Sequence, residues 1–138
     1  MREQLLALLI IPPFLSILLT FYMRWVVGNF IKQVPCIDNE RHIELFKQTV
    51  RIAMLGALSQ LLLMFIPTIV YVFGFAKEIL PIEDLVYVVV PAVAYLVVTL
   101  PYKRMEVRAQ RVRVENYSLL HEYIRVKEVW LRRSFPIW

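Results

Sequence analysis

The sequence predicts an all-α integral membrane protein with three transmembrane helices and a helical C-terminal tail. Of its 138 residues, 59% are hydrophobic and 20% are charged, and the mean hydropathy is +0.60. A soluble domain is about half apolar and about a quarter charged. Three long stretches, residues 5–23, 52–76 and 85–102, contain no Asp, Glu, Lys or Arg at all. The basic residues are also shared very unequally between the segments that connect these stretches.

Each uncharged stretch has the length of a membrane-spanning helix. A hydrocarbon layer about 30 Å thick requires about 20 apolar residues in a helix, and every backbone polar group within it must be hydrogen-bonded, which favours helices. The first stretch follows Arg2 as in a signal peptide, but residues 21–25 offer no small residues for cleavage. We therefore expect a retained helix. The prolines inside the spans, Pro12, Pro13, Pro67 and Pro91, predict local bends.

The charge distribution predicts the orientation of the three spans. The N-terminus and residues 77–84 carry only two Lys or Arg residues, whereas residues 24–51 and 103–138 carry fourteen. Basic segments remain inside, so we expect an N-out/C-in multi-pass protein of the bacterial or mitochondrial inner membrane. Basic residues next to the spans attract anionic lipid headgroups, and those expected to do so are Arg24, Lys103, Arg104, Arg108 and Arg111.

The segment between the first two spans predicts a helix that begins in water and continues into the membrane. Pro35 interrupts the first helix, and Asp38 or Asn39 is suited to cap the next one. Ile43, Phe46 and Val50 then share one face. Cys36 and His42 are too few ligands for a metal site, and Cys36 is expected to be a reduced thiol.

The polar residues inside the spans predict contacts between helices. No His, Asp or Glu lies in them, which argues against a proton relay or a haem site. We expect Gly56, Ser59 and Gln60 to mediate helix contacts, the last two by hydrogen bonding. A pore-lining or quinone-contacting role for Ser59 and Gln60 is the alternative.

The chain divides in this prediction into a transmembrane region, residues 1–104, and a helical tail, residues 105–138. Apolar residues in the tail recur every three or four positions, with one Asn among them, in a heptad-like pattern. Such a stripe fits a coiled-coil partner, and it equally fits a helix that lies on lipid or on a larger subunit. The expected partner-binding stripe consists of Met105, Ala109, Val112, Asn116, Leu119, Tyr123, Val126 and Trp130.

These features favour a non-catalytic structural or assembly subunit of a larger membrane complex, in contact with other integral-membrane subunits and anionic lipids. The sequence has only three Gly and shows no phosphate-binding loop, nucleophile elbow or paired intramembrane carboxylates. We therefore expect no enzyme activity, metal or cofactor, although structural lipids are expected. Nucleic-acid binding is not expected either, because Glu106 and Glu115 interrupt the basic cluster. The alternative is a homo-oligomeric pore-forming or holin-like protein.

Overall fold

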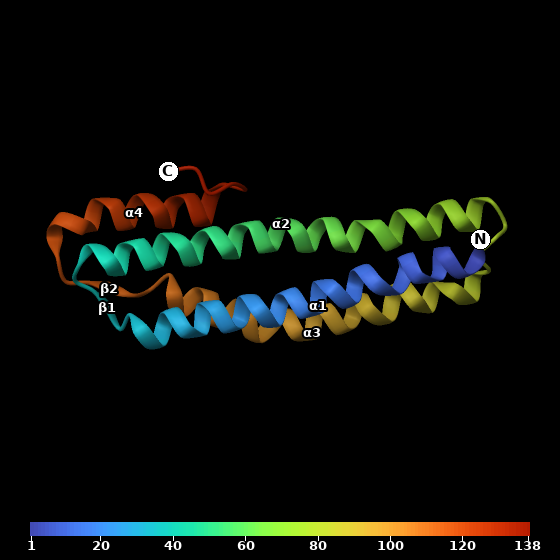
Figure 1. Cartoon of the computed structure of the whole chain (residues 1–138), viewed down its shortest axis with the longest axis horizontal. Coiled ribbons are helices and arrows are strands. Elements are labelled where there is room, and N and C mark those ends of the chain that lie inside the picture. The colour runs from blue at the N-terminus through green and yellow to red at the C-terminus, as the bar shows by residue number, and fades with distance from the viewer. The chain divides into compact units, whose positions relative to one another are not determined.

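The computed structural model describes residues 1–138 and is almost entirely helical (Figure 1). Its elements are α1 (Arg2–Gln33), β1 (Cys36–Ile37), α2 (Glu40–Ala76), the short 3-10 helix η1 (Ile82–Leu85), α3 (Val86–Ala109), β2 (Arg113–Val114) and α4 (Tyr117–Arg132). Three of the helices are long and apolar enough to cross a membrane. The all-helical class and the three membrane-spanning candidates predicted from the sequence are thus confirmed.

The chain folds as two compact units, and α1, α2 and α3 contribute residues to both. We name residues 1–21 and 59–100 the apolar unit, and residues 22–58 and 101–138 the tail unit. This division differs from the predicted one at residue 104. The tail is combined with the segment that joins the first two spans, because its apolar residues are buried on that segment.

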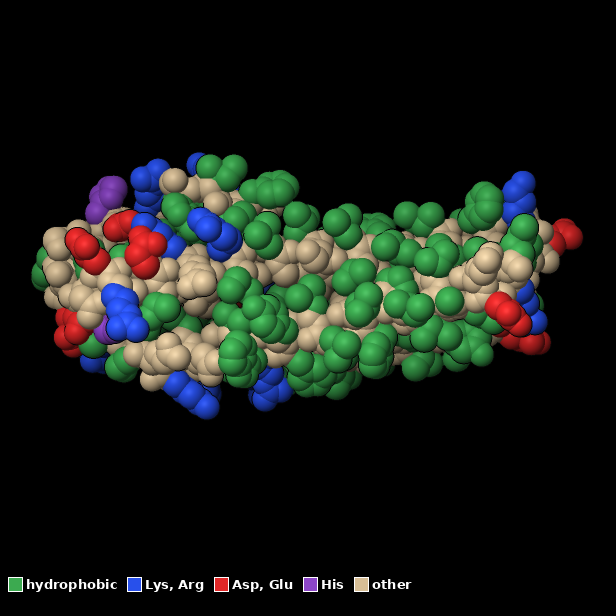
Figure 2. Space-filling view, in the orientation of Figure 1, with side chains coloured by type: hydrophobic (Ala, Val, Ile, Leu, Met, Phe, Trp, Pro, Cys, Tyr) green, Lys and Arg blue, Asp and Glu red, His purple; other side chains and the backbone are tan.

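The apolar unit contains the three long helices where they are most hydrophobic. Its buried positions include Leu9, Ser16, Thr20 and Leu80, and Leu80 packs against Gly74, where a Cβ would overlap its side chain. Most other large side chains of this unit are exposed. On the face seen in Figure 2, hydrophobic side chains gather over these helices. Such a surface is compatible with a lipid environment.

The tail unit is a small globular fold built on the first part of α2. Asn39 caps α2, since its side-chain oxygen accepts a hydrogen bond from the His42 backbone N–H at 2.9 Å, as predicted. Strands β1 and β2 pair in parallel, with Cys36 opposite Arg113. Figure 1 shows α4 lying along α2. The predicted face of α2 is buried, with Ile43 at 2% exposure and both Phe46 and Val50 at 0%.

Phe46 is the centre of this fold. Its ring lies 4.9 Å from that of Tyr123 and 6.0 Å from that of Trp130, both on α4, and 5.6 Å from that of Phe30 on α1. Aromatic pairs at these separations contribute beyond the area that they bury. One side chain of α2 thereby joins two other helices of the tail unit.

The continuous tail helix predicted from residue 105 to residue 130 is wrong. Helix α3 ends at Ala109, β2 follows, and α4 begins at Tyr117. Asn116, expected inside a helical seam, is instead the N-cap of α4, and its side chain accepts a hydrogen bond from the Ser118 backbone N–H at 3.1 Å. Asn competes with helical hydrogen bonding inside a helix but stabilises a helix start.

We predict that Phe46→Ala destabilises the tail unit by about 3–5 kcal/mol, because it opens a cavity among three aromatic rings. Unfolding of the purified protein in mixed micelles with increasing dodecyl sulfate, followed by Trp fluorescence, measures this loss. Leu131→Ala is the matched control, since Leu131 on α4 is 57% exposed. Equal stability of the two variants would contradict the assignment of Phe46 to the core.

Candidate functional site: the Gln60 cluster, the outer faces and the folded tail

A buried polar cluster joins the three helices of the apolar unit. Gln60 on α2 is 4% exposed, and its Nε2 donates hydrogen bonds to Thr20 Oγ1 and to the Ser16 carbonyl oxygen at 3.4 Å, both on α1. The Tyr95 hydroxyl on α3 donates to Gln60 Oε1 at 3.3 Å. We name Ser16, Thr20, Gln60 and Tyr95 the Gln60 cluster. It uses both ends of one amide to connect three helices.

Of the other two residues expected to mediate helix contacts, Gly56 is buried in such a contact and Ser59 is exposed. Gly56, in the tail unit, is buried against Met23, and a Cβ at this position would overlap the Met23 side chain. The absence of a side chain therefore permits close packing there. Ser59 is exposed on the outer face of α2 and does not belong to the Gln60 cluster. Proximity to Gln60 in the sequence was misleading, because adjacent helical residues point about 100° apart.

The outer face of α3 is the least covered apolar surface of the apolar unit. Only 6% of its most hydrophobic stretch is buried, compared with 28% in α1 and in α2. The exposed side chains of α3 recur every three or four residues and therefore share one face. We name this surface the valine face: Val86, Val89, Val90, Val93 and Val97, which are 49–62% exposed.

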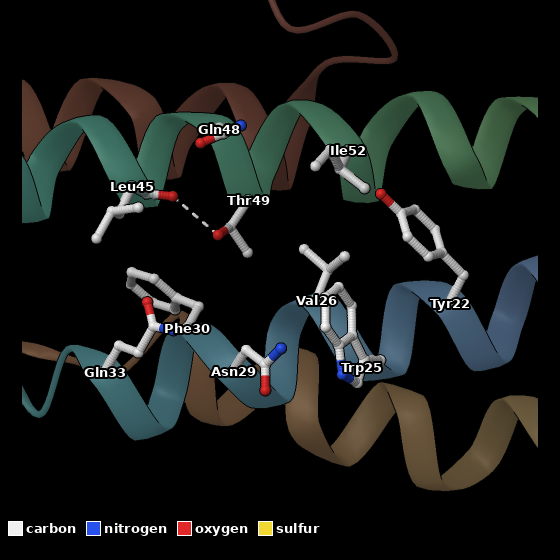
Figure 3. A pocket seen from close by; sticks show the side chains of 10 residues that line it. All are labelled: Tyr22, Trp25, Val26, Asn29, Phe30, Gln33, Leu45, Gln48, Thr49 and Ile52. Atoms are coloured by element: carbon white, nitrogen blue, oxygen red, sulfur yellow. Dashed lines mark hydrogen bonds between the residues drawn. The ribbon is translucent and has the colours of Figure 1, made fainter.

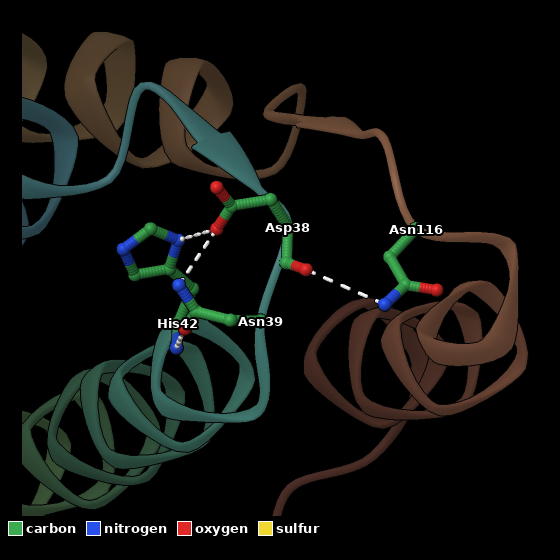
Figure 4. Close-up of polar contacts among 4 residues, drawn as sticks. All are labelled: Asp38, Asn39, His42 and Asn116. Atoms are coloured by element: carbon green, nitrogen blue, oxygen red, sulfur yellow. Dashed lines mark hydrogen bonds and ion pairs between the residues drawn. The ribbon is translucent and has the colours of Figure 1, made fainter.

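The start of α4 is fixed by polar contacts with the turn before α2 (Figure 4). Asn116 Nδ2 donates to the Asp38 carbonyl oxygen at 3.4 Å. The Asp38 carboxylate lies 2.7 Å from His42 Nδ1 and accepts a hydrogen bond from Asn39 Nδ2 at 2.8 Å. The Glu115 backbone N–H donates to the Ile37 carbonyl oxygen at 3.0 Å, which extends the β1–β2 pairing. Strand β2 and the two residues that follow it are thus hydrogen-bonded to residues 36–38.

The residues of the predicted partner-binding stripe are mostly used inside the chain. Leu119, Tyr123, Val126 and Trp130 are at most 8% exposed on α4, and Ala109 is fully buried. The other three are less covered: Met105 and Val112 are half-buried, and Asn116 is exposed. Met105 reaches Gly28, where a Cβ would meet its terminal methyl group. The correction is that the stripe is covered by α2 and α1, and little of it remains for another protein.

Charged residues that sequence reasoning missed connect α4 to the rest of the tail unit. Glu106 is 9% exposed and accepts hydrogen bonds from Trp130 Nε1 at 3.1 Å and from Lys103 Nζ at 2.7 Å. Lys47 on α2 pairs with Glu122 on α4. Glu106 was interpreted only as an interruption of basic charge, because a contact between residues 24 positions apart leaves no local signal.

In the apolar unit, a second missed pair lies at the other end of the helices. Arg2 Nη2 lies 3.3 Å from Asp84 Oδ2, and the Asp84 side chain is almost fully buried. This ion pair joins the start of α1 to η1, so it fixes the N-terminus beside the connection between α2 and α3. The sequence analysis had counted Arg2 only among the basic residues of the N-terminus, because a contact between residues 82 positions apart leaves no local signal.

The residues expected to meet lipid headgroups are all exposed. Arg24 lies on α1, Lys103, Arg104 and Arg108 lie on α3, and Arg111 precedes β2. The C-terminal segment is also held in the tail unit, since the Arg51 guanidinium lies 5.5 Å from the centre of the Trp138 ring.

Two ionisable groups of the tail unit have a raised pKa. Burial raises the pKa of the Tyr123 hydroxyl, which donates a hydrogen bond to the Gln110 carbonyl oxygen at 2.8 Å. Desolvation, and then the negative charges of Glu115 and Asp38, raise the pKa of the Cys36 thiol. Cys36 is thus a less reactive thiol than an isolated cysteine. No group of three or more His, Cys, Asp or Glu side chains is placed to hold a metal ion.

In comparisons with known proteins, no family model, curated protein or solved structure matched the chain.

We predict that Gln60→Leu destabilises the apolar unit by about 0.5–2 kcal/mol, the range measured for hydrogen bonds between membrane helices. Resistance to dodecyl sulfate in mixed micelles reports the loss. Ser16→Ala is the control within the same cluster: the Ser16 hydroxyl oxygen is buried without a hydrogen-bond partner, and the alanine keeps the backbone acceptor. A larger loss in Ser16→Ala than in Gln60→Leu would contradict the assigned hydrogen bonds.

Proposed function

We propose that the protein is a non-catalytic accessory subunit of an integral-membrane complex that packs the valine face of α3 against another membrane protein. The observation that carries this proposal is the low burial of α3, whose most hydrophobic stretch is only 6% buried, compared with 28% in α1 and in α2. The Gln60 cluster and the Arg2–Asp84 pair hold α1, α2 and α3 together, so the valine face is presented by a preorganised support.

The chemistry of the valine face favours a protein partner. β-Branched side chains have few rotamers in a helix, so packing them against another helix costs little side-chain entropy. Association of membrane helices depends on such close packing, because lipid tails are as apolar as the helices themselves. A stripe of five valines is therefore better suited to a fixed helix contact than a stripe of flexible side chains.

The folded tail changes the role proposed for the C-terminal region. Its apolar stripe is already buried within the tail unit, so we propose contacts through the membrane-spanning faces in place of a coiled coil. The alternative, a homo-oligomeric pore, is less well supported, because Ser59 and Thr68 are the only polar side chains exposed on α2 within the apolar unit. Gln60 instead makes its hydrogen bonds inside the apolar unit.

We predict that a photo-crosslinking amino acid at Val93 forms one dominant adduct with a different membrane protein in native membranes. The same probe at Phe65, an exposed residue of α2, is expected to give mainly lipid adducts. Val93→Trp places a bulky side chain on the valine face and should therefore reduce co-purification of that protein in mild detergent.

Two outcomes would contradict the accessory role. Adducts with lipid alone at Val93 would show that the valine face meets only the bilayer. An adduct with a second copy of the chain would favour the homo-oligomeric alternative. Mass spectrometry of the crosslinked band distinguishes these results from the expected one.

We further propose the N-out/C-in orientation, and the single cysteine provides a test of it. Cys36 is the only thiol and lies in the tail unit. A membrane-impermeant maleimide is expected to label Cys36 only after cells are permeabilised, at alkaline pH because the pKa of this thiol is raised. Cys36→Ser combined with Glu83→Cys should reverse the pattern. Labelling of Cys36 in intact cells would contradict the orientation.

A further inference from the structure

A pocket between α1 and α2 in the tail unit changes in chemistry along its length (Figure 3). Its volume is about 250 Å³. Tyr22, Val26 and Ile52 line one end, and the amide side chains of Asn29 and Gln48 line the part that follows along the two helices. Phe30, Gln33 and Leu45 line the remaining part. A pocket with an apolar end and amide groups beyond it fits an amphipathic ligand.

The polar groups of this pocket are free to bind a ligand. Asn29, Gln33 and Gln48 make no side-chain hydrogen bond within the chain, whereas the Thr49 hydroxyl donates to the Leu45 carbonyl oxygen at 2.8 Å. An unpaired amide supplies two N–H donors and one carbonyl acceptor. Three such amides beside aromatic rings suit the ester and glycerol oxygens of a lipid better than they suit a charged metabolite.

A second hollow, of about 390 Å³, adjoins the first and shares Leu45 and Gln48 with it. Its cations are Arg41, Lys47 and Arg51, and its one acidic side chain, Glu44, is paired with Lys47. Arg41 and Arg51 have no acidic partner, and the Trp138 ring lies over the Arg51 guanidinium. Arginine binds phosphate oxygens in a bidentate manner, so this hollow has the charge of an anion site.

The position of both hollows along the helices identifies the source of the anion. The uncharged stretches of α1 and α2 end at Met23 and begin at Ile52, which places Tyr22 and Ile52 at the edge of the hydrocarbon layer. Arg51 is the next residue outward, and Gln48 lies one turn beyond Ile52. Tyr and Trp are enriched at this depth, and Tyr22 stacks with Trp25 there, their ring centres 6.2 Å apart.

We infer that the tail unit binds one anionic phospholipid, with its phosphate at Arg51, its ester oxygens at Gln48 and Asn29, and the start of one acyl chain beside Tyr22 and Ile52. Such a lipid occupies one defined site of the tail unit and differs from the loosely held lipids expected around Arg24 and the α3 arginines. Binding requires only this chain in a membrane or micelle, so it does not depend on the accessory role.

Quenching of Trp25 fluorescence tests the inference on the purified full chain in detergent. Trp25 lines the pocket, and Trp25→Phe supplies the background from the other two tryptophans. Phosphatidylglycerol with brominated acyl chains is titrated, and unbrominated phosphatidylglycerol, phosphatidylcholine and inorganic phosphate serve as competitors. We expect saturable quenching that unbrominated phosphatidylglycerol reverses and that phosphatidylcholine and inorganic phosphate reverse only weakly.

Matched variants locate the phosphate. Arg51→Gln is expected to weaken phosphatidylglycerol binding about fivefold, the change associated with one basic residue at a membrane surface. Arg113→Gln removes the same charge from another exposed site of the tail unit, one that lines neither hollow, and should change binding less than twofold. Gln48→Leu, also at an exposed position, should weaken binding without any change in charge.

Three results would overturn the inference. Quenching that rises linearly and equally with either lipid would indicate contact with bulk lipid only. Efficient reversal by inorganic phosphate would indicate a phosphate site without lipid selectivity. Identical affinities in Arg51→Gln and Arg113→Gln would show that the second hollow does not hold the phosphate.

Discussion

Both units are built on one uninterrupted helix, α2, whose two parts differ in side-chain chemistry. Between Asn39 and Arg51, α2 is amphipathic, with Ile43, Phe46 and Val50 buried on one side and charges on the other. From Ile52 it carries no charge for 25 residues. Hydrogen bonds within the helix satisfy its backbone in water and in hydrocarbon, so the change in side chains alone moves the chain from one environment to the other. The tail unit is assembled on the amphipathic part, and the Gln60 cluster on the uncharged part.

The fold class was accessible from the sequence because hydrocarbon imposes a simple rule. A stretch without charge and of sufficient length is helical, and α1, α2 and α3 contain the three stretches identified. The cap at Asn39 and the buried face around Phe46 were equally readable, since both follow from local periodicity and local hydrogen bonding. These features depend on residues within a few turns of one another.

The tail shows where such reasoning fails. A spacing of three and four residues from Met105 to Trp130 suits one long helix, yet the chain between Gln110 and Asn116 is a turn, a short strand and a cap. The alternation Arg111-Val-Arg-Val114 and the Asn-x-Ser sequence at 116–118 were signals for a break. They were outweighed because the strand gains its hydrogen bonds from β1, 77 residues earlier in the chain, and only tertiary structure reveals that partner. The Glu106–Trp130 and Arg2–Asp84 contacts escaped for the same reason.

The folding of the tail determines which surfaces remain for function. A helix that buries Leu119, Tyr123, Val126 and Trp130 on α2 has used the apolar area with which it would otherwise bind a partner. The longest uncovered apolar surface lies in the apolar unit, above all on α3. What remains polar and unpaired lies between α1 and α2 at the edge of the hydrocarbon, where amides and an arginine adjoin aromatic rings. The valine face is uncharged and suits packing against another helix. The pocket between α1 and α2 combines apolar and polar groups and suits an amphipathic molecule.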